Sequence, residues 1–67
     1  MISKVLFYRK AIKLNQKEVA NYLGISVDGY AKKERGETEF KASEMENFFQ
    51  LVKKEIPSAK VEDIFFS

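Results

Sequence analysis

Hydrophobic residues recur every three or four positions along most of this chain, which is the spacing of one face of an α-helix. Near the N-terminus the pattern runs from Ile2 through Val5, Leu6 and Ile12, and it predicts a helix from Ile2 to about Lys13. Further runs of the same period follow in the middle and the last third of the chain. We therefore expect an all-α protein.

Capping residues mark the ends of the second and third helices. Asn15 is expected to cap the second helix, and Glu18 stands three residues later, where it completes a capping box. Gly24 then ends that helix in a left-handed conformation. Ser26 caps a third helix, which Gly36 ends in the same way.

The last third of the chain predicts two further helices. After a polar link at 37–39, the fourth helix has its hydrophobic residues at Ala42, Met45, Phe48, Phe49 and Val52. Pro57 stops it, and Ser58 is expected to cap a short fifth helix. That helix carries four apolar residues, of which one side would close the core and any exposed remainder would form a dimer or partner interface: Val61, Ile64, Phe65 and Phe66.

The amino-acid composition excludes several classes of function and adds less about the fold. The chain has 67 residues and neither cysteine nor histidine, which fits one domain (1–67) and excludes disulfides, Cys/His zinc sites and the commonest catalytic groups. We expect neither enzymatic activity nor a cofactor or metal. Because no apolar stretch approaches the roughly 20 residues of a membrane span, we expect a soluble cytoplasmic protein.

The charge is distributed unevenly. Residues 1–33 carry seven basic and two acidic side chains, a net charge of +5, whereas residues 34–67 carry five basic and eight acidic ones, a net charge of −3. Such polarity fits a protein that turns one face to a polyanion. Accidental segregation on an ordinary solvated surface explains it equally well.

The most informative stretch, residues 14–36, reads LNQKEVANYLGISVDGYAKKERG. It resembles the helix-turn-helix of the phage Cro and repressor family. The positions that carry the resemblance are Gln16, Ala20, Gly24, Ile25, Ser26, Glu34, Arg35 and Gly36. It implies a compact five-helix, lambda-repressor-like domain. Such a domain would act as a small transcription regulator, a repressor that binds operator DNA with the third helix in the major groove.

The resemblance and the chemistry of the residues together nominate a DNA-binding set. By resemblance, Gln16 contacts a phosphate, while Arg9 and Glu34 form an internal salt bridge between the first and third helices. Lys10 and Lys17 are candidates for phosphate pairing, with plain solvation as the alternative. Ser26 is expected to be both a cap and a neighbour of a phosphate.

The outer face of the third helix contains residues 27, 28, 29 and 32. Val27 could meet a thymine methyl group, and Lys32 could reach a guanine or a phosphate. Asp28 could accept a hydrogen bond from cytosine N4, or serve only to stabilise the helix dipole. Gly29 lowers helix propensity and adds no side chain to this face.

The third helix departs from the family pattern at Lys33, Asp28 and Gly29, and the last two, together with the acidic second half of the chain, keep other functions open. Lys33 stands where an apolar residue is usual, and we expect its stem to cover the core while its ammonium group reaches outward to water. Asp28 and Gly29 make a poor reading face. A modulator or antirepressor that binds a second regulator protein, and an antitoxin that binds both DNA and a partner, are therefore the alternative functions; a homodimer is a further hypothesis.

Overall fold

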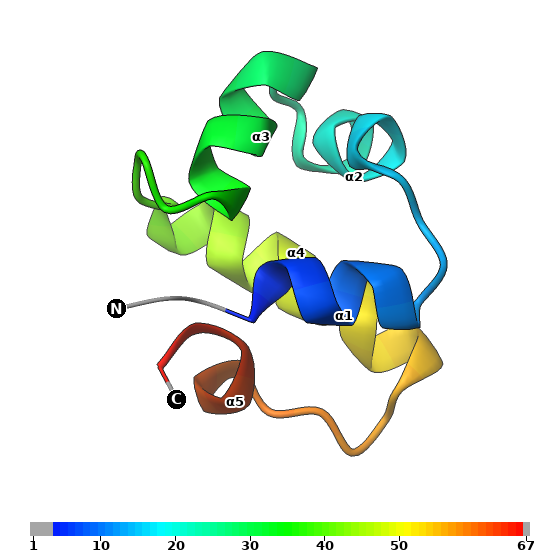
Figure 1. The fold of residues 1–67 in the computed structure, drawn as a ribbon. Coiled ribbons are helices and arrows are strands. Elements are labelled where there is room, and N and C mark those ends of the chain that lie inside the picture. The colour runs from blue at the N-terminus through cyan, green and yellow to red at the C-terminus, as the bar shows by residue number, and fades with distance from the viewer. Residues whose placement is uncertain (1–3, 67) are drawn as a thin grey trace.

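Five helices follow one another in the computed structural model, which describes residues 4–66 (Figure 1). They are α1 (Val5–Ala11), α2 (Gln16–Leu23), α3 (Val27–Glu34), α4 (Ala42–Glu55) and α5 (Val61–Phe65). No strand occurs within that range, so the all-α prediction is confirmed. No helix in it has both the length and the apolar character to cross a bilayer.

The core lies where α1, α4 and α5 meet the packed pair α2 and α3 (Figure 1). The backbone N–H of Lys4 donates to the carbonyl oxygen of Ile64 at 2.7 Å, which joins the start of α1 to the end of α5. Every helix contributes to the core, whose buried hydrophobic residues are Val5, Ile12, Val19, Ala20, Leu23, Tyr30, Phe40, Phe48, Val52, Ile64 and Phe65.

Local capping forms α2 and α3 as their sequences predict. The Asn15 side chain accepts from the Glu18 backbone N–H at 2.8 Å, and the Glu18 carboxylate accepts from the Asn15 N–H at 2.9 Å, which completes the capping box. Ser26 caps α3, with its Oγ accepting from the Gly29 N–H. Gly24 and Gly36 follow these helices with φ of +75° and +83°, the left-handed region that favours glycine.

The end of α1 was predicted two residues too late. Lys13 lies outside the helix, with φ of +63°, and is the non-glycine residue of 4–66 that takes a positive φ. Its N–H donates to the Lys10 carbonyl and the Leu14 N–H donates to the Arg9 carbonyl, the same pair of bonds that follows α2 and α3. A lysine therefore fills a position suited to glycine. Ile2 lies outside the described residues.

The prediction that Ser58 caps α5 was wrong. The N–H of Ala59 donates to the Ile56 carbonyl at 2.9 Å, so Pro57 and Ser58 are the two central residues of a turn. The helix begins only at Val61, and its N-cap residue is Lys60, which makes no side-chain capping bond. The turn that proline favours thus takes Ser58 away from the helix start.

Aromatic packing explains where the apolar tail goes. Phe40 lies between Tyr30 and Phe65, with ring centroids 6.3 Å and 5.4 Å away, and Phe65 also packs edge-on against Phe48 at 6.1 Å. Ile64 is fully buried as well. Ile64 and Phe65 therefore form the side of the tail that closes the core, as the sequence suggested for one side of it, and Phe66 stays exposed.

Replacing Lys13 with glycine should stabilise the protein by about 0.5–1 kcal/mol, because it relieves the left-handed strain of an L-residue at some cost in unfolded-chain entropy. Urea unfolding followed by circular dichroism measures the change. The matched control is Lys10→Gly, which places glycine inside α1 and should destabilise by about 1 kcal/mol. A Lys13→Gly protein less stable than the parent would contradict this account.

Candidate nucleic-acid interface

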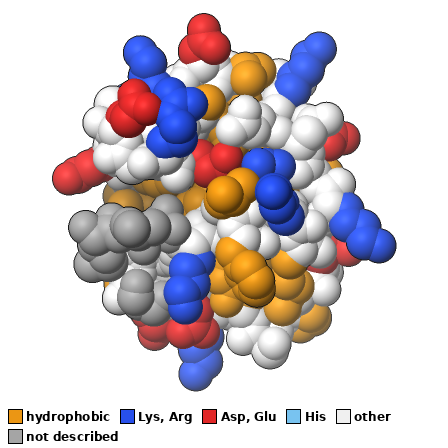
Figure 2. All heavy atoms as spheres, viewed as in Figure 1, with side chains coloured by type: hydrophobic (Ala, Val, Ile, Leu, Met, Phe, Trp, Pro, Cys, Tyr) orange, Lys and Arg blue, Asp and Glu red, His pale blue; other side chains and the backbone are white. Residues whose placement is uncertain are grey.

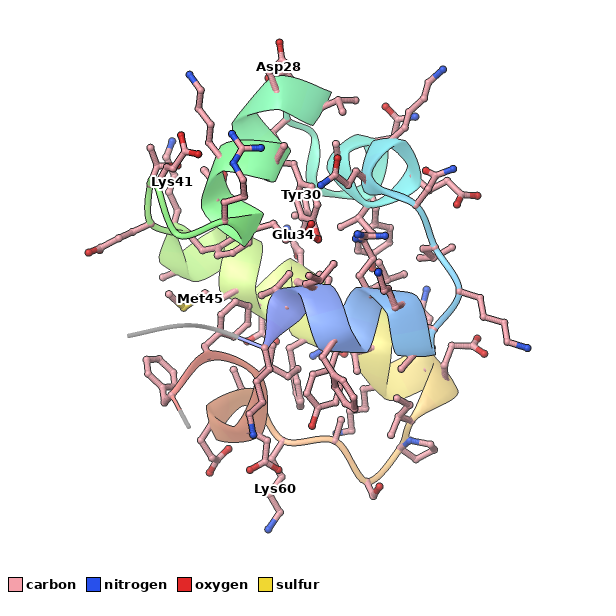
Figure 3. The ribbon with its side chains drawn as sticks, in the orientation of Figure 1. Asp28, Tyr30, Glu34, Lys41, Met45 and Lys60 are labelled. Atoms are coloured by element: carbon pink, nitrogen blue, oxygen red, sulfur yellow. The ribbon has the colours of Figure 1, made fainter. Side chains whose placement is uncertain are left out.

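The C-terminal end of α3 is fixed by one buried carboxylate, that of Glu34. Its Oε2 accepts from Arg9 Nε and from the Tyr30 hydroxyl, each at 2.7 Å. Its Oε1 accepts from Gln16 Nε2 at 2.8 Å and from Arg9 Nη2 at 3.3 Å. Figure 3 shows Tyr30 and Glu34 directed into the space enclosed by α1, α2 and α3, so this carboxylate joins all three helices.

The pair of Arg9 and Glu34 that the sequence nominated is present, and it is largely shielded from water. The Glu34 side chain is 4% exposed and that of Arg9 is 11% exposed. Arg9 also donates through Nη1 to the Leu14 carbonyl at 2.9 Å, which fixes the connection between α1 and α2. The guanidinium group therefore uses three of its nitrogens to hold separate parts of the chain together.

The surroundings of Glu34 keep it ionised. Burial raises the pKa of its carboxyl, but hydrogen bonds from Arg9, Gln16 and Tyr30 outweigh burial and hold that pKa below its ordinary value. Burial and then the bond to Glu34 raise the pKa of the Tyr30 hydroxyl, which therefore stays a donor. The hydrogen bond to Glu34 likewise raises the pKa of Arg9.

Gln16, nominated as a phosphate contact, has a structural bond that sequence reasoning missed. It lies half-buried in the first turn of α2, and its amide nitrogen donates to Glu34. An amide nitrogen has two N–H groups and the side chain also has a carbonyl, so one bond to Glu34 leaves donor and acceptor capacity. Replacing Gln16 would nevertheless disturb α3, which makes it a poor probe of DNA contact.

The N-terminal part of α3 presents the candidate reading face. Val27 is 38% exposed, and Asp28 and Lys32 are also exposed. Asp28 points away from the body of the protein in Figure 3, on the side of α3 opposite to the inward-pointing Tyr30. The periodicity of α3 thus separates a buried side from an outward side, as the sequence predicted for residues 27, 28 and 32.

Gly29 has a local steric role that the sequence did not reveal. A Cβ placed on this residue would lie 3.0 Å from Ser26 Oγ, the atom that caps α3. The Gly29 N–H donates to that same oxygen at 3.0 Å. With a larger residue at position 29 the Ser26 hydroxyl would have to shift by a few tenths of an ångström, whereas glycine leaves the capping bond undisturbed.

The expectation that the Lys33 ammonium group reaches water was wrong. Lys33 Nζ lies 2.5 Å from Glu44 Oε1, and both side chains are mostly buried. The same Glu44 oxygen accepts from the Lys41 N–H at 2.8 Å, so Glu44 joins the end of α3 to the start of α4. The available signal was the position of Glu44, three residues after the N-cap of α4.

The exposed basic candidates come from different helices. Lys10 lies on α1, Lys17 on the first turn of α2, and Lys32 on α3. Directly after α3, Arg35 forms an exposed ion pair with Glu37, with Nε and Oε2 2.6 Å apart. Figure 2 shows basic and acidic side chains interspersed over the upper part of this face, around α2 and α3, rather than an unbroken positive surface.

Comparison with known proteins adds no assignment: no family model, curated protein or solved structure matches the chain. Within residues 4–66, no group of acidic residues is placed to hold a metal ion. The geometry of α2 and α3 and the chemistry of their exposed side chains are therefore the basis for a functional proposal.

Removing the Tyr30 hydroxyl should destabilise the protein by about 1.5–2 kcal/mol at pH 7, since a hydrogen bond to a charged group is lost. The stabilisation from Glu34 is complete above its ordinary pKa of 4.5 and is lost as pH falls through the lower pKa of the folded state. The deficit of Tyr30→Phe should therefore shrink on acidification. Urea unfolding between pH 7 and pH 3 provides the measurement.

Tyr22→Phe is the matched control for this experiment, because Tyr22 is an exposed tyrosine on α2 whose ring faces the Lys54 ammonium group. Removing the Tyr22 hydroxyl should change the free energy of unfolding little at any pH. A deficit of Tyr30→Phe that is equally large at pH 3 and pH 7 would show that ionised Glu34 does not strengthen the bond.

Proposed function

We propose that this protein is a transcription regulator, acting as a repressor, that binds double-stranded DNA with the N-terminal face of α3 in the major groove. The observation that carries the proposal is that α3 is held against α1 and α2 by hydrogen bonds on its inward side. Its outward face presents Val27, Asp28 and Lys32, while Glu34 on its inward side is bonded to both α1 and α2. A reading helix needs such a rigid support, because base contacts depend on its orientation in the groove.

Three further features support DNA as the ligand. Residues 14–36 resemble the helix-turn-helix of phage Cro and repressor proteins, and in the structure the two helices of this stretch pack on each other. Lys10, Lys17 and Lys32 are exposed and form none of the ion pairs found in residues 4–66. A lysine without an ion-pair partner can neutralise a DNA phosphate and release the counterion condensed on it.

Titration of duplex DNA at about 50 and 200 mM salt tests the proposal. Binding should weaken with salt, and the slope of log K against log salt should become shallower by about 0.9 for each phosphate contact removed by Lys17→Ala. Lys60→Ala is the matched control, since Lys60 is exposed and lies at the end of the molecule opposite Asp28 (Figure 3). It should leave the affinity and the slope unchanged.

Absence of DNA binding at the lower salt concentration would overturn this function. An equal effect of Lys17→Ala and Lys60→Ala would mean that binding follows total charge and not the proposed face. The alternative is a modulator that binds a second regulator protein. Exposed aromatic side chains favour it, because Phe7 on α1 is 66% exposed and Phe66 after α5 is 56% exposed.

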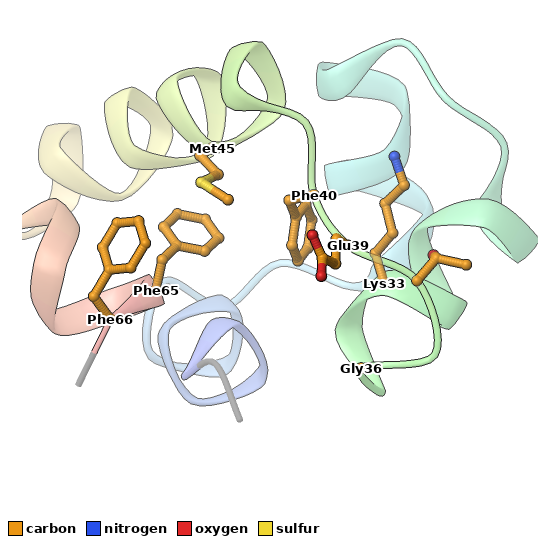
Figure 4. A pocket seen from close by; sticks show the side chains of 8 residues that line it. Lys33, Gly36, Glu39, Phe40, Met45, Phe65 and Phe66 are labelled. Carbon is orange, nitrogen blue, oxygen red and sulfur yellow. The ribbon is translucent and has the colours of Figure 1, made fainter. Parts of the chain in front are cut away.

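For binding to a palindromic operator, we propose that two copies of the chain pair through the surface around Phe66. This side chain borders a half-open cavity of about 340 Å³ between α5, the start of α4 and the link before it (Figure 4). The apolar part of the wall consists of Phe40, Met45 and Phe65. An exposed ring beside an aromatic cavity gives each copy both a projecting and a receiving group, as a two-fold contact requires.

Sedimentation of the purified protein should show a dimer that dissociates on dilution, and Phe66→Ser should shift it to the monomer. The matched control is Phe7→Ser, an equally drastic change of an exposed phenylalanine on α1, which should leave the dimer intact. Circular dichroism verifies that both variants are folded. A parent protein that is monomeric at high micromolar concentration, or a dimer lost only in Phe7→Ser, would refute pairing at this surface.

A further inference from the structure

We infer that Asp28 acts as a base-selecting residue: its carboxylate favours sites that place a cytosine beneath the start of α3, and it weakens binding to all other DNA. This inference rests on the proposed function, because it specifies which DNA the α3 face accepts.

The first step is that Asp28 is not needed as a cap. Ser26 already performs that role through its bond from the Gly29 N–H. Asp28 forms none of the ion pairs found in residues 4–66, and its side chain points outward from the N-terminal end of α3 (Figure 3). The carboxylate is therefore directed at whatever α3 approaches.

The second step concerns what a carboxylate can meet on DNA. An ionised carboxylate only accepts hydrogen bonds, and it is repelled by phosphates. In the major groove, guanine presents acceptors at O6 and N7 and thymine an acceptor at O4, whereas cytosine presents its N4 donor. Adenine has a donor at N6 next to an acceptor at N7, which the carboxylate would face as well. Cytosine is therefore the base that suits Asp28 best.

The third step is the neighbourhood of Asp28 on α3. Lys32 lies one helical turn further along the same side and is exposed, so it can donate to guanine O6 and N7. Arg35 continues this stripe but is already paired with Glu37. Gly29 adds no side chain beside the carboxylate. The Asp28 carboxylate and the Lys32 ammonium group therefore place an acceptor and a donor one turn apart. They match the N4 donor of cytosine and the O6 and N7 acceptors of guanine in a C·G base pair.

The experiment is a selection of binding sites from a random duplex library, followed by affinity measurements on the selected site and on random-sequence DNA. The parent protein should select a cytosine that Asp28→Ala no longer selects, with discrimination at that base falling about 5- to 100-fold. The same variant should bind random-sequence DNA more tightly, because it lacks the carboxylate that the DNA phosphates repel. Asp28→Asn should move the preference toward adenine, which asparagine contacts at N6 and N7.

Glu62→Ala is the matched control, since Glu62 is an exposed acidic residue in the first turn of α5 and its replacement changes the net charge equally. It should alter neither the selected site nor the discrimination. If Asp28→Ala retains the cytosine preference, or loses specific and random-sequence affinity together, this inference is overturned while the proposed function stands. If the parent protein binds no DNA, the proposed function falls and the inference with it.

Discussion

The buried carboxylate of Glu34 is the interaction on which the arrangement of the first three helices depends. A charge removed from water is costly unless it is paired and its remaining lone pairs are satisfied. Here those conditions are met only when Arg9 of α1, Gln16 of α2 and Tyr30 of α3 converge on the same two oxygens. A hydrophobic contact tolerates sliding, but these directional bonds select one relative orientation. The hydrogen bonds to Glu34 therefore fix the direction in which the outward face of α3 points.

Ion pairs inside the protein also change what the uneven charge of the two halves implies for the surface. Two of the seven basic residues in 1–33 are neutralised inside the protein, Arg9 by Glu34 and Lys33 by Glu44. Both acidic partners belong to the acidic second half of the chain. The asymmetry in sequence therefore partly reflects attraction between the halves on folding, and only the remaining lysines contribute to the field outside.

Apart from the Arg9–Glu34 pair, which the family resemblance suggested across 25 positions, the features that the sequence predicted are local ones. The capping box of Asn15 and Glu18, the Ser26 cap and the glycines after α2 and α3 each involve residues a few positions apart, so a short motif suffices. The exceptions are informative. Lys13 takes a glycine-like conformation while Arg9 holds the adjacent Leu14 carbonyl, and the Pro57 turn removes Ser58 from its helix. The bonds of Gln16 to Glu34 and of Lys33 to Glu44 join residues 18 and 11 positions apart, and no motif specifies such partners.

The link between Lys4 and Ile64 has a consequence for the order of events during synthesis. α1 is made before α5, yet its first backbone bond across the fold and part of the core beneath it come from Ile64 and Phe65 of α5. While the chain emerges from the ribosome, the helices made earlier are not yet covered by Ile64 and Phe65, and their apolar faces stay exposed to solvent. The packing of these helices is therefore completed only once α5 has emerged, and until then the nascent chain is a substrate for chaperones and proteases.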